Sequence, residues 1–277
     1  MISSYEAKYR ALLDDVAYAG QLKTSRAGNT KSIFGTVLRI DSLRMGKFPI
    51  LTARWMFYKP VLGELAAFLR GATDLTTFKD FGCNYWDANA AAWNQNIGLP
   101  TTYQDVGQIY GAQWRNWADR DDCDQIEKLL HSIHDNPSGR RHLLTTYDPS
   151  EHWHCLPPCH LLAQFNVTPD SYLDCCVYMR SVDLCLGLPS DVILYAALLL
   201  LIAKQTKLAP GNLTFMMGDT HIYVNHLDTW EIQRLEQCHD LPPYQLDSEA
   251  TVDNFIPEHF QLHDYQHGDK LVYPFNV

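Results

Sequence analysis

Twelve consecutive apolar residues, 192–203, constrain the fold of this chain more than any other feature of its sequence. The run is too short to span a bilayer, so it indicates a core helix. A helix that is apolar on every side has to be covered on every side. The chain has 277 residues, of which 46% are hydrophobic, and is long enough to provide that cover. We therefore expect a buried helix over residues 191–205.

Periodicity and turn residues predict further helices and strands around this core helix. Helical spacing covers residues 3–19, 59–71 and 122–139. Strand-like segments cover residues 32–42, 140–148 and 160–183, and the last of these reads as two strands joined by a Pro-Asp turn. Over residues 213–228, another strand leads into a loop and a helix. Helices and strands do not alternate regularly, which favours an α+β fold. No linker, repeat or charge block divides the sequence, so a single domain over residues 1–277 is expected.

The charge and the cysteines limit the class of protein. A formal charge of −10 disfavours general binding to nucleic acid, because an acidic surface repels polyphosphate. A small anionic ligand would need a local cluster of arginines. The N-terminus lacks the pattern of a signal peptide, and the eight cysteines are therefore expected to be free thiols in a reducing cytoplasm. We predict a cytoplasmic protein without a membrane partner.

The segment LPPCHLLAQF makes Cys159 a candidate nucleophile. Two prolines stiffen the approach to the thiol, and a neighbouring arginine would lower its pKa. The alternatives are an inert buried cysteine, a thiol hydrolase that uses His160 as its base, and a metal site within residues 152–160. Adjacent strand residues point to opposite faces, which disfavours His160 as that base. The Cys-x3-Cys spacing is too loose for zinc, so we predict no metal.

Motifs along nearly the whole chain resemble the thymidylate synthase superfamily. In chain order they are SIFG, FPILTAR, GELAAFLRG, YWDANAAAW, YGAQWRNW, SGRRHLL, PPCHLLAQF, YMRSVDLCLGLPSDVILYA and MGDTHIYVNH. The resemblance implies an α+β fold with a large mixed sheet that packs against helices, the sheet face forming a homodimer interface. It also implies an enzyme in which a thiol adds to C6 of a pyrimidine monophosphate, and C5 then attacks the one-carbon unit of 5,10-methylenetetrahydrofolate, the co-substrate.

The resemblance assigns roles to individual residues, and simple chemistry agrees with several of them. A soft thiolate suits addition to C6, a phosphate dianion needs arginines, and a buried carboxylate is costly without a partner. The proposed catalytic groups are Cys159, Glu64, Tyr110 and Asp191. The substrate ligands are Arg26, Arg180, Ser181, Asp191, His221 and Tyr223, with Arg140 and Arg141 contributed across the dimer interface. The folate-side positions are Arg54, Trp86, Asn89, Asp183, Gly187 and Val277.

Asp191 departs from the pattern of the synthases, in which an asparagine reads uracil. A carboxylate offers only acceptors, so it suits the N4 amino group of cytosine, and N3 once that atom is protonated. The dCMP hydroxymethylases of the family carry an aspartate here, which makes dCMP the predicted substrate. The alternative is an N-cap of the apolar helix, and the two roles are compatible.

Departures on the folate side bear on the product. Asn89 stands where a second tryptophan is usual, and it could admit water that yields 5-hydroxymethyl-dCMP. Arg54 replaces a lysine that is expected to meet the folate tail, and Phe57 replaces a histidine. Trp86, Leu156 and the C-terminal PFNV favour exclusion of water, hence 5-methyl-dCMP and dihydrofolate. We predict hydroxymethylation, with the dCMP methyltransferase as the nearest alternative. A dUMP-specific enzyme and an inactive nucleotide- or RNA-binding relative are less favoured.

Overall fold

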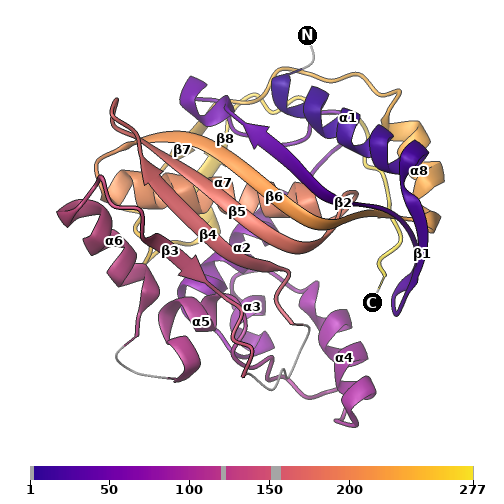
Figure 1. Ribbon diagram of the computed structural model, residues 1–277, viewed down its shortest axis with the longest axis horizontal. Coiled ribbons are helices and arrows are strands. Elements are labelled where there is room, and N and C mark those ends of the chain that lie inside the picture. The colour runs from indigo at the N-terminus through magenta and orange to yellow at the C-terminus, as the bar shows by residue number, and fades with distance from the viewer. Residues whose placement is uncertain (1–2, 120–122, 151–156, 277) are drawn as a thin grey trace.

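A six-stranded mixed sheet forms the centre of the protein, whose computed structural model describes residues 3–119, 123–150 and 157–276 (Figure 1). The strands, in their order across the sheet, are β1 (Gln21–Ser25), β2 (Gly28–Ile40), β6 (Ala209–Tyr223), β5 (Tyr172–Asp183), β4 (His160–Val167) and β3 (His142–Thr145). Neighbouring strands are antiparallel, except that β5 and β6 are parallel. The predicted α+β class with a large mixed sheet is confirmed.

Helix α7 (Gly187–Gln205) connects β5 to β6, and it is the reason these two strands are parallel. The helix lies behind the sheet together with α2 (Tyr58–Leu69), and it packs on β5, β6 and α2 (Figure 1). Among the described residues, α7 alone is long and apolar enough to cross a membrane. Its apolar window is nevertheless 78% buried inside the protein, as predicted for a core helix.

The beginning of α7 corrects one of the expectations from sequence. The helix begins at Gly187, four residues before the predicted start, and its N-cap residue is Leu186, whose side chain makes no cap hydrogen bond. Asp191 therefore lies inside the helix, and the N-cap interpretation of this aspartate is wrong. The Gly-Leu-Pro sequence is compatible with a first helical turn, because proline at an early position lacks only an N–H that has no partner there.

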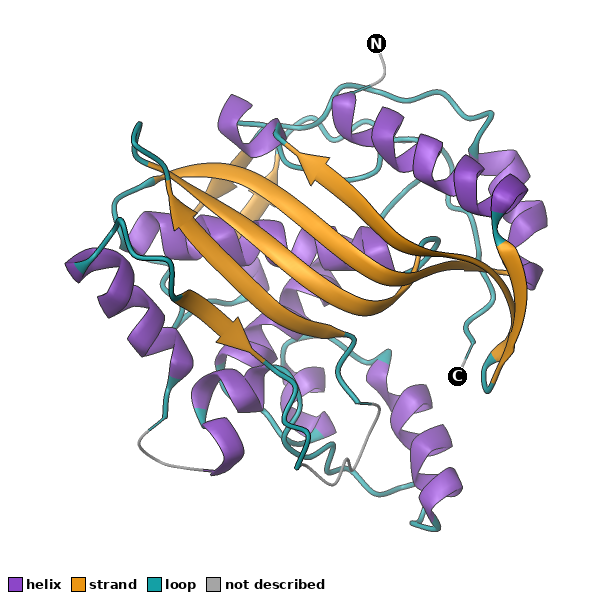
Figure 2. Ribbon diagram, viewed as in Figure 1, coloured by secondary structure: helices purple, strands orange, loops and turns teal. Residues whose placement is uncertain are grey.

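The remaining helices surround the sheet at its ends and edges (Figure 2). They are α1 (Ser4–Ala19), α3 (Leu75–Asp80), α4 (Trp86–Ile97), α5 (Gly111–Arg115), α6 (Gln125–Asp135) and α8 (Leu227–Gln233). A small second sheet pairs β7 (Tyr244–Leu246) with β8 (Phe260–Leu262). The predicted helices at residues 3–19 and 59–71 are confirmed, and the helix predicted over 122–139 is present but shorter, as α6. Helices α3, α4 and α5 were not predicted, because they are short or carry little apolar periodicity.

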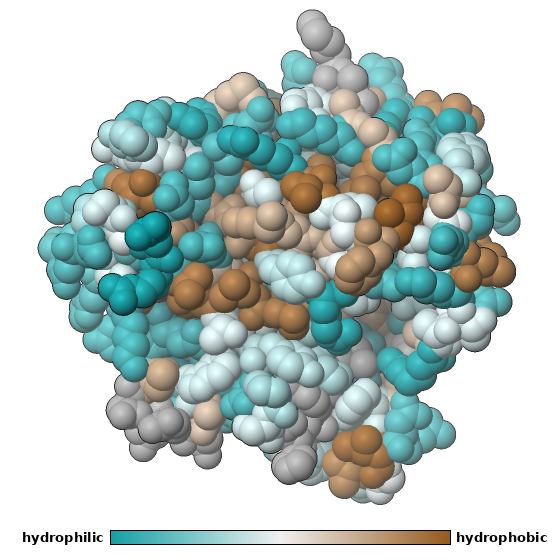
Figure 3. All heavy atoms as spheres, in the orientation of Figure 1, coloured by the Kyte–Doolittle hydropathy of each residue, from teal (hydrophilic) through white to brown (hydrophobic). Residues whose placement is uncertain are grey.

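The face of the sheet that points away from α7 is apolar and open to solvent (Figure 3). Val37 on β2, Met216 on β6 and Tyr178 on β5 are paired across the strands, so they form one row on this face. The large exposed apolar side chains on the strands are Leu22, Phe34, Val37, Leu143, Tyr178 and Met216, with exposed fractions between 40% and 76%. Such a continuous apolar face is unusual in a protein that acts alone.

Candidate active site

Cys159 lies just before β4, and two backbone hydrogen bonds fix its position. Its N–H donates to the Tyr110 hydroxyl at 2.8 Å, and its carbonyl accepts from the backbone N–H of Arg180 on β5 at 2.9 Å. Tyr110 precedes α5 with a φ of 37°, a conformation that is costly for a tyrosine and is common at functional sites. Cys159, Tyr110 and Arg180, which were predicted to belong to one site, therefore lie together in the structure.

The Arg180 guanidinium braces the segment that carries Cys159. Its Nε donates to the carbonyl of Pro158 at 2.8 Å and its Nη2 donates to that of Pro157 at 2.6 Å. Its positive charge lowers the pKa of the Cys159 thiol, but burial has the larger effect and the pKa is raised overall, with the Asp191 charge adding to the increase. The arginine lowers the pKa as expected, but in the free protein desolvation outweighs this single neighbouring cation.

Asp191 is held by His160, a residue that the sequence suggested only as the base of a thiol hydrolase or as part of a metal site. The Asp191 Oδ1 lies 3.0 Å from Nε2 of His160, and the other ring nitrogen, Nδ1, lies 3.2 Å from the Tyr195 hydroxyl. Cys159 precedes β4, and the register of β4 is irregular after His160. Both ring nitrogens of His160 have partners other than the Cys159 thiol, which does not support the hydrolase alternative.

Glu64 projects from α2 into the same region, where both of its carboxylate oxygens accept hydrogen bonds. The Trp86 indole N–H donates to Oε1 at 2.6 Å, and the Tyr85 hydroxyl donates to Oε2 at 2.7 Å. Burial raises the pKa of Glu64 to about 7, and the charge of Asp191 acts in the same direction, whereas the two hydrogen bonds and His160 lower it. A carboxyl group with this pKa exchanges protons near neutral pH, as a general acid or base must.

The residues predicted to bind sugar and phosphate gather at the ends of three neighbouring strands. His221 and Tyr223 end β6, and the His221 Nδ1 lies 3.2 Å from Oδ1 of Asp219, which pairs in register with Ser181 on β5. Arg26 is exposed in the turn between β1 and β2. Burial raises the pKa of Tyr223, and the Arg26 guanidinium is close enough to lower it. A cation is therefore present beside the predicted sugar ligands.

Arg140 and Arg141 are placed differently. Both are exposed and immediately precede β3, the strand at the opposite edge of the sheet from β1 and the Arg26 turn. The two arginines do introduce a strand, as predicted, but the fold of one chain does not bring them to Arg26. Their assignment to the substrate of a second subunit stays a prediction.

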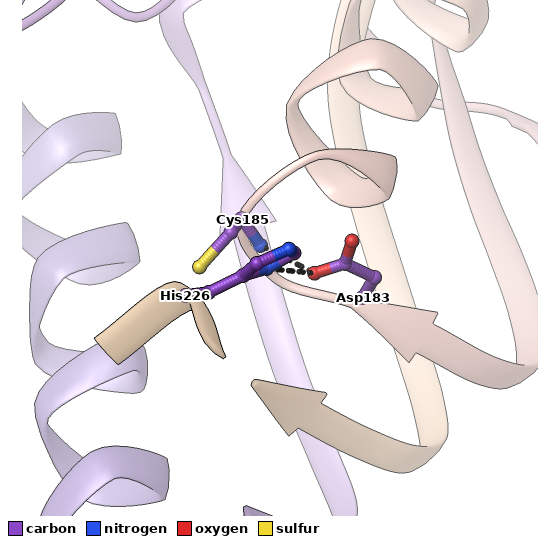
Figure 4. A group of neighbouring side chains, drawn as sticks. All are labelled: Asp183, Cys185 and His226. Atoms are coloured by element: carbon purple, nitrogen blue, oxygen red, sulfur yellow. Dashed lines mark hydrogen bonds and ion pairs between the residues drawn. The ribbon is translucent and has the colours of Figure 1, made fainter. Parts of the chain in front are cut away.

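Asp183 ends β5 on the predicted folate side, next to a cysteine and a histidine (Figure 4). Its Oδ1 accepts from the backbone N–H of Cys185 at 2.9 Å and lies 3.7 Å from the Nδ1 of His226. The three possible ligand atoms lie within 4.8 Å of one another. A metal would need the thiolate, but burial raises the pKa of the Cys185 thiol, which disfavours a metal centre here.

Gly187 leaves open the space between the two carboxylates of this region. A Cβ atom on Gly187 would lie 3.6 Å from the Asp183 Cβ and 3.9 Å from Oδ2 of Asp191. A larger side chain at position 187 would fill this space. With glycine there, a flat ring has room to contact both Asp191 and Asp183. The carboxylate of Asp183 can accept further hydrogen bonds, as its predicted role beside the amino and N–H groups of a pterin requires.

Arg54 does not project toward solvent, as a ligand of the folate tail would. It is almost completely buried, its Nη2 donates to the carbonyl of Cys185 at 2.5 Å, and its guanidinium lies 4.9 Å from the centre of the Tyr273 ring. We therefore correct its expected role: Arg54 holds the C-terminal segment against the start of α7. Trp86 and Asn89 lie one turn apart on α4, the tryptophan buried and the asparagine half-buried.

The C-terminal segment is fixed near the site by several polar contacts. His226 Nε2 lies 2.7 Å from the carbonyl oxygen of Pro274, and the side chains of Asn225 and Asn276 are hydrogen-bonded to each other. The expected folate ligand Val277 lies outside the described residues, as do Leu156 and the residues His152, His154 and Cys155 of the metal alternative.

Comparisons with known proteins place these features in a family. A family model described as thymidylate synthase matches residues 7–277. Bifunctional dihydrofolate reductase-thymidylate synthases of Leishmania amazonensis and Leishmania major are 37% and 36% identical over 284 residues, which cover 97% of this chain and 54% of each relative. Thymidylate synthase 1/2 of Encephalitozoon cuniculi is 35% identical over 274 residues, which cover 94% of this chain and 92% of the relative. The chain spans about half the length of the two bifunctional proteins.

Proposed function

Because the chain belongs to the thymidylate synthase family of folate-dependent one-carbon transferases, we propose that it modifies C5 of dCMP and releases 5-hydroxymethyl-dCMP. The carboxylate at position 191 is the observation that carries this choice of base. His160 engages Oδ1 of Asp191, so Oδ2 is the acceptor that remains for the N4 amino group of cytosine. Uracil would place its O4 acceptor opposite Oδ2 in the same position, so these two oxygens would have no donor between them.

The proposed mechanism starts with the Cys159 thiol, whose sulfur forms a bond with C6 of cytosine, and the proton lost from sulfur is balanced by the proton gained at N3. Asp191 binds N4 and favours protonation of N3, which makes C6 a better electrophile. C5 then attacks the methylene carbon of the co-substrate. Glu64 and Tyr110 serve the later transfer of the C5 proton, and the pKa of Glu64 near 7 suits both its uptake and its release. Cleavage of the bond between sulfur and C6 frees the product.

Loss of the C5 proton and cleavage of the carbon–nitrogen bond to tetrahydrofolate leave an exocyclic methylene group on C5. The product depends on what then adds to this group. Addition of water gives the hydroxymethyl group and free tetrahydrofolate, and a polar, half-buried Asn89 supports access of water. Transfer of hydride from tetrahydrofolate gives a methyl group and dihydrofolate. The buried Trp86 and the anchored C-terminal segment favour this second candidate, a dCMP C5 methyltransferase, because both restrict water.

Mass spectrometry of the product made from dCMP and 5,10-methylenetetrahydrofolate in ¹⁸O-labelled water tests the proposal. We expect a product that carries one labelled oxygen, and no dihydrofolate absorbance. An unlabelled methylated product with stoichiometric dihydrofolate would identify the methyltransferase instead. A protein that modifies dUMP and leaves dCMP unchanged would contradict the assignment of the base. Release of tritium from 5-tritiated dCMP reports attack at C5 under either outcome.

We also propose a homodimer that forms through the open face of the sheet. The exposed apolar row of Val37, Met216 and Tyr178 supports this, because burying it in a second copy removes a large apolar surface from water. The exposed pair Arg140 and Arg141 would then complete the phosphate site of the partner subunit. We propose a cytoplasmic location, with no stable nucleic-acid or membrane partner.

A further inference from the structure

Tyr85 lies at the wall of the site, immediately before α4, and none of the roles above involves it. Its side chain has two distinct surroundings. The ring is partly exposed, since the residue retains 36% of its accessible surface, whereas the hydroxyl points inward to Oε2 of Glu64 at 2.7 Å. Burial, followed by the charge of Glu64, raises the pKa of Tyr85 well above its ordinary value, so the hydroxyl keeps its proton.

The two hydrogen bonds to Glu64 differ in what their donors can do. The indole N–H of Trp86 can only donate, so it satisfies Oε1 when that oxygen carries no proton. A hydroxyl can donate and accept. When Glu64 takes up a proton, Oε2 is therefore the favourable position, because a proton on Oε1 would face the indole N–H. The Tyr85 oxygen then becomes the acceptor.

This exchange requires another acceptor for the hydroxyl proton of Tyr85, and Cys83 provides one. The Cys83 thiol is fully buried and interacts with the Tyr85 hydroxyl. The Tyr85 hydroxyl thus stands between a carboxyl group that changes protonation and a sulfur that stays a neutral thiol, because burial raises the pKa of Cys83 well above its usual range.

We propose that Tyr85 is a positioning residue that holds Glu64 in one orientation in both of its protonation states. As a donor it orients the carboxylate, and as an acceptor, with its own proton turned to Cys83, it orients the carboxylic acid. The other groups that face Glu64 are Trp86, Asp191 of α7 and His160 of β4. The inference rests on the acid-base role proposed for Glu64, whose carboxyl group would otherwise rotate each time it gained a proton.

The test is an infrared titration of the Glu64 carboxyl band in the free protein, identified by its loss in Glu64→Gln. Tyr85→Phe removes the donor to the carboxylate and the acceptor from the carboxylic acid. Because the hydrogen bond to the charged carboxylate is the stronger of the two, the titration midpoint should rise by about one pH unit. The acidic limb of the pH profile of kcat should move in the same direction. Tyr103→Phe is the matched control, because this similarly exposed tyrosine donates to Asp105, away from Glu64, and should leave the midpoint unchanged.

A second variant has the opposite expected sign. Cys83→Ala removes the acceptor used when Glu64 is protonated, so the midpoint should fall. A general loosening of the site would shift the titration midpoint of Glu64 in the same direction in both variants, and that result would overturn the proposal. An unchanged midpoint in Tyr85→Phe would also overturn it. Should Tyr85→Phe fail to fold, the direction in Cys83→Ala decides. Full activity of Glu64→Gln would reject the acid-base role of Glu64, while the titration would still report on Tyr85.

Discussion

Cys159 is fixed by backbone hydrogen bonds, so replacing its side chain tests chemistry with little change in geometry. We expect Cys159→Ser to lose several orders of magnitude in kcat, because a hydroxyl is a far weaker nucleophile toward C6. Binding of dCMP should remain detectable by calorimetry, since the phosphate and sugar ligands are untouched. Retention of more than about a tenth of the activity would exclude Cys159 as the nucleophile.

Asp191 is expected to determine which base is accepted. Asp191→Asn supplies both a donor and an acceptor, so preference should move from dCMP toward dUMP, with the phosphate contacts unchanged. An unpaired acceptor facing uracil costs about 1–3 kcal/mol, which corresponds to roughly fivefold to 150-fold in kcat/KM. The measurement is kcat/KM for both nucleotides in both proteins. The same dCMP:dUMP ratio in the variant, or a wild type that prefers dUMP, would disprove the assignment.

Glu64 should make the stability of the protein depend on pH. Its pKa is raised from 4.5 to about 7, so the native state holds a proton that the unfolded chain has lost. Stability from this group is present below pH 4.5 and is lost as pH rises through 7, a difference of about 3 kcal/mol. We expect the free energy of unfolding to fall less between pH 5 and pH 8 in Glu64→Gln than in the wild type. Urea titrations at the two pH values measure this, and equal losses would contradict it.

At the scale of elements, α2 is positioned by a close approach at Gly63. A Cβ there would lie 2.1 Å from the carbonyl oxygen of Phe81, in the segment that leads to Cys83 and Tyr85. Alanine normally stabilises a helix interior relative to glycine, but here overpacking should reverse the sign, and Gly63→Ala should lose about 1–3 kcal/mol.

Gly187→Ala in α7 is the matched control for this prediction. Its Cβ would meet only ordinary contacts, so the free energy of unfolding should stay the same or rise. Activity should fall, because the added methyl group would occupy the space beside Asp183. Urea unfolding of both variants provides the comparison. Equal stability effects of the two substitutions would show that the approach at Gly63 tolerates a methyl group.

At the scale of the whole molecule, the proposed dimer predicts shared active sites. An inactive Cys159→Ser chain mixed with an inactive Arg141→Ala chain should recover part of the activity. In the mixed dimer, one site has both its own Cys159 and the intact Arg141 of the other subunit. Cys159→Ser mixed with Glu64→Gln is the control and should recover none, because both groups act within one chain. Demonstrated subunit exchange without recovery in the first mixture would reject the shared site.

Most of the framework could be predicted from local signals. Short stretches of sequence were enough to predict three features: the apolar run at residues 192–203, the helical spacing of residues 3–19 and the Pro-Asp turn before β5. The helix at α4 escaped prediction, since its alanine-rich sequence carries little apolar periodicity. The start of α7 was missed for a related reason: Gly-Leu-Pro resembles a turn, and only packing behind the sheet favours a helical turn there.

The sequence by itself determined the α+β class, the buried central helix and the identity of most groups in the site, because residue type and spacing encode secondary structure and chemistry. Only the tertiary structure decided that His160 binds Asp191, that Tyr85 shares Glu64 with Trp86, and that Arg54 is buried. These pairs are separated by long stretches of chain, and neither partner carries a local sign of the other. Burial also set the protonation of Cys159 and Glu64, since desolvation depends on everything packed around a group and not on its neighbours in sequence.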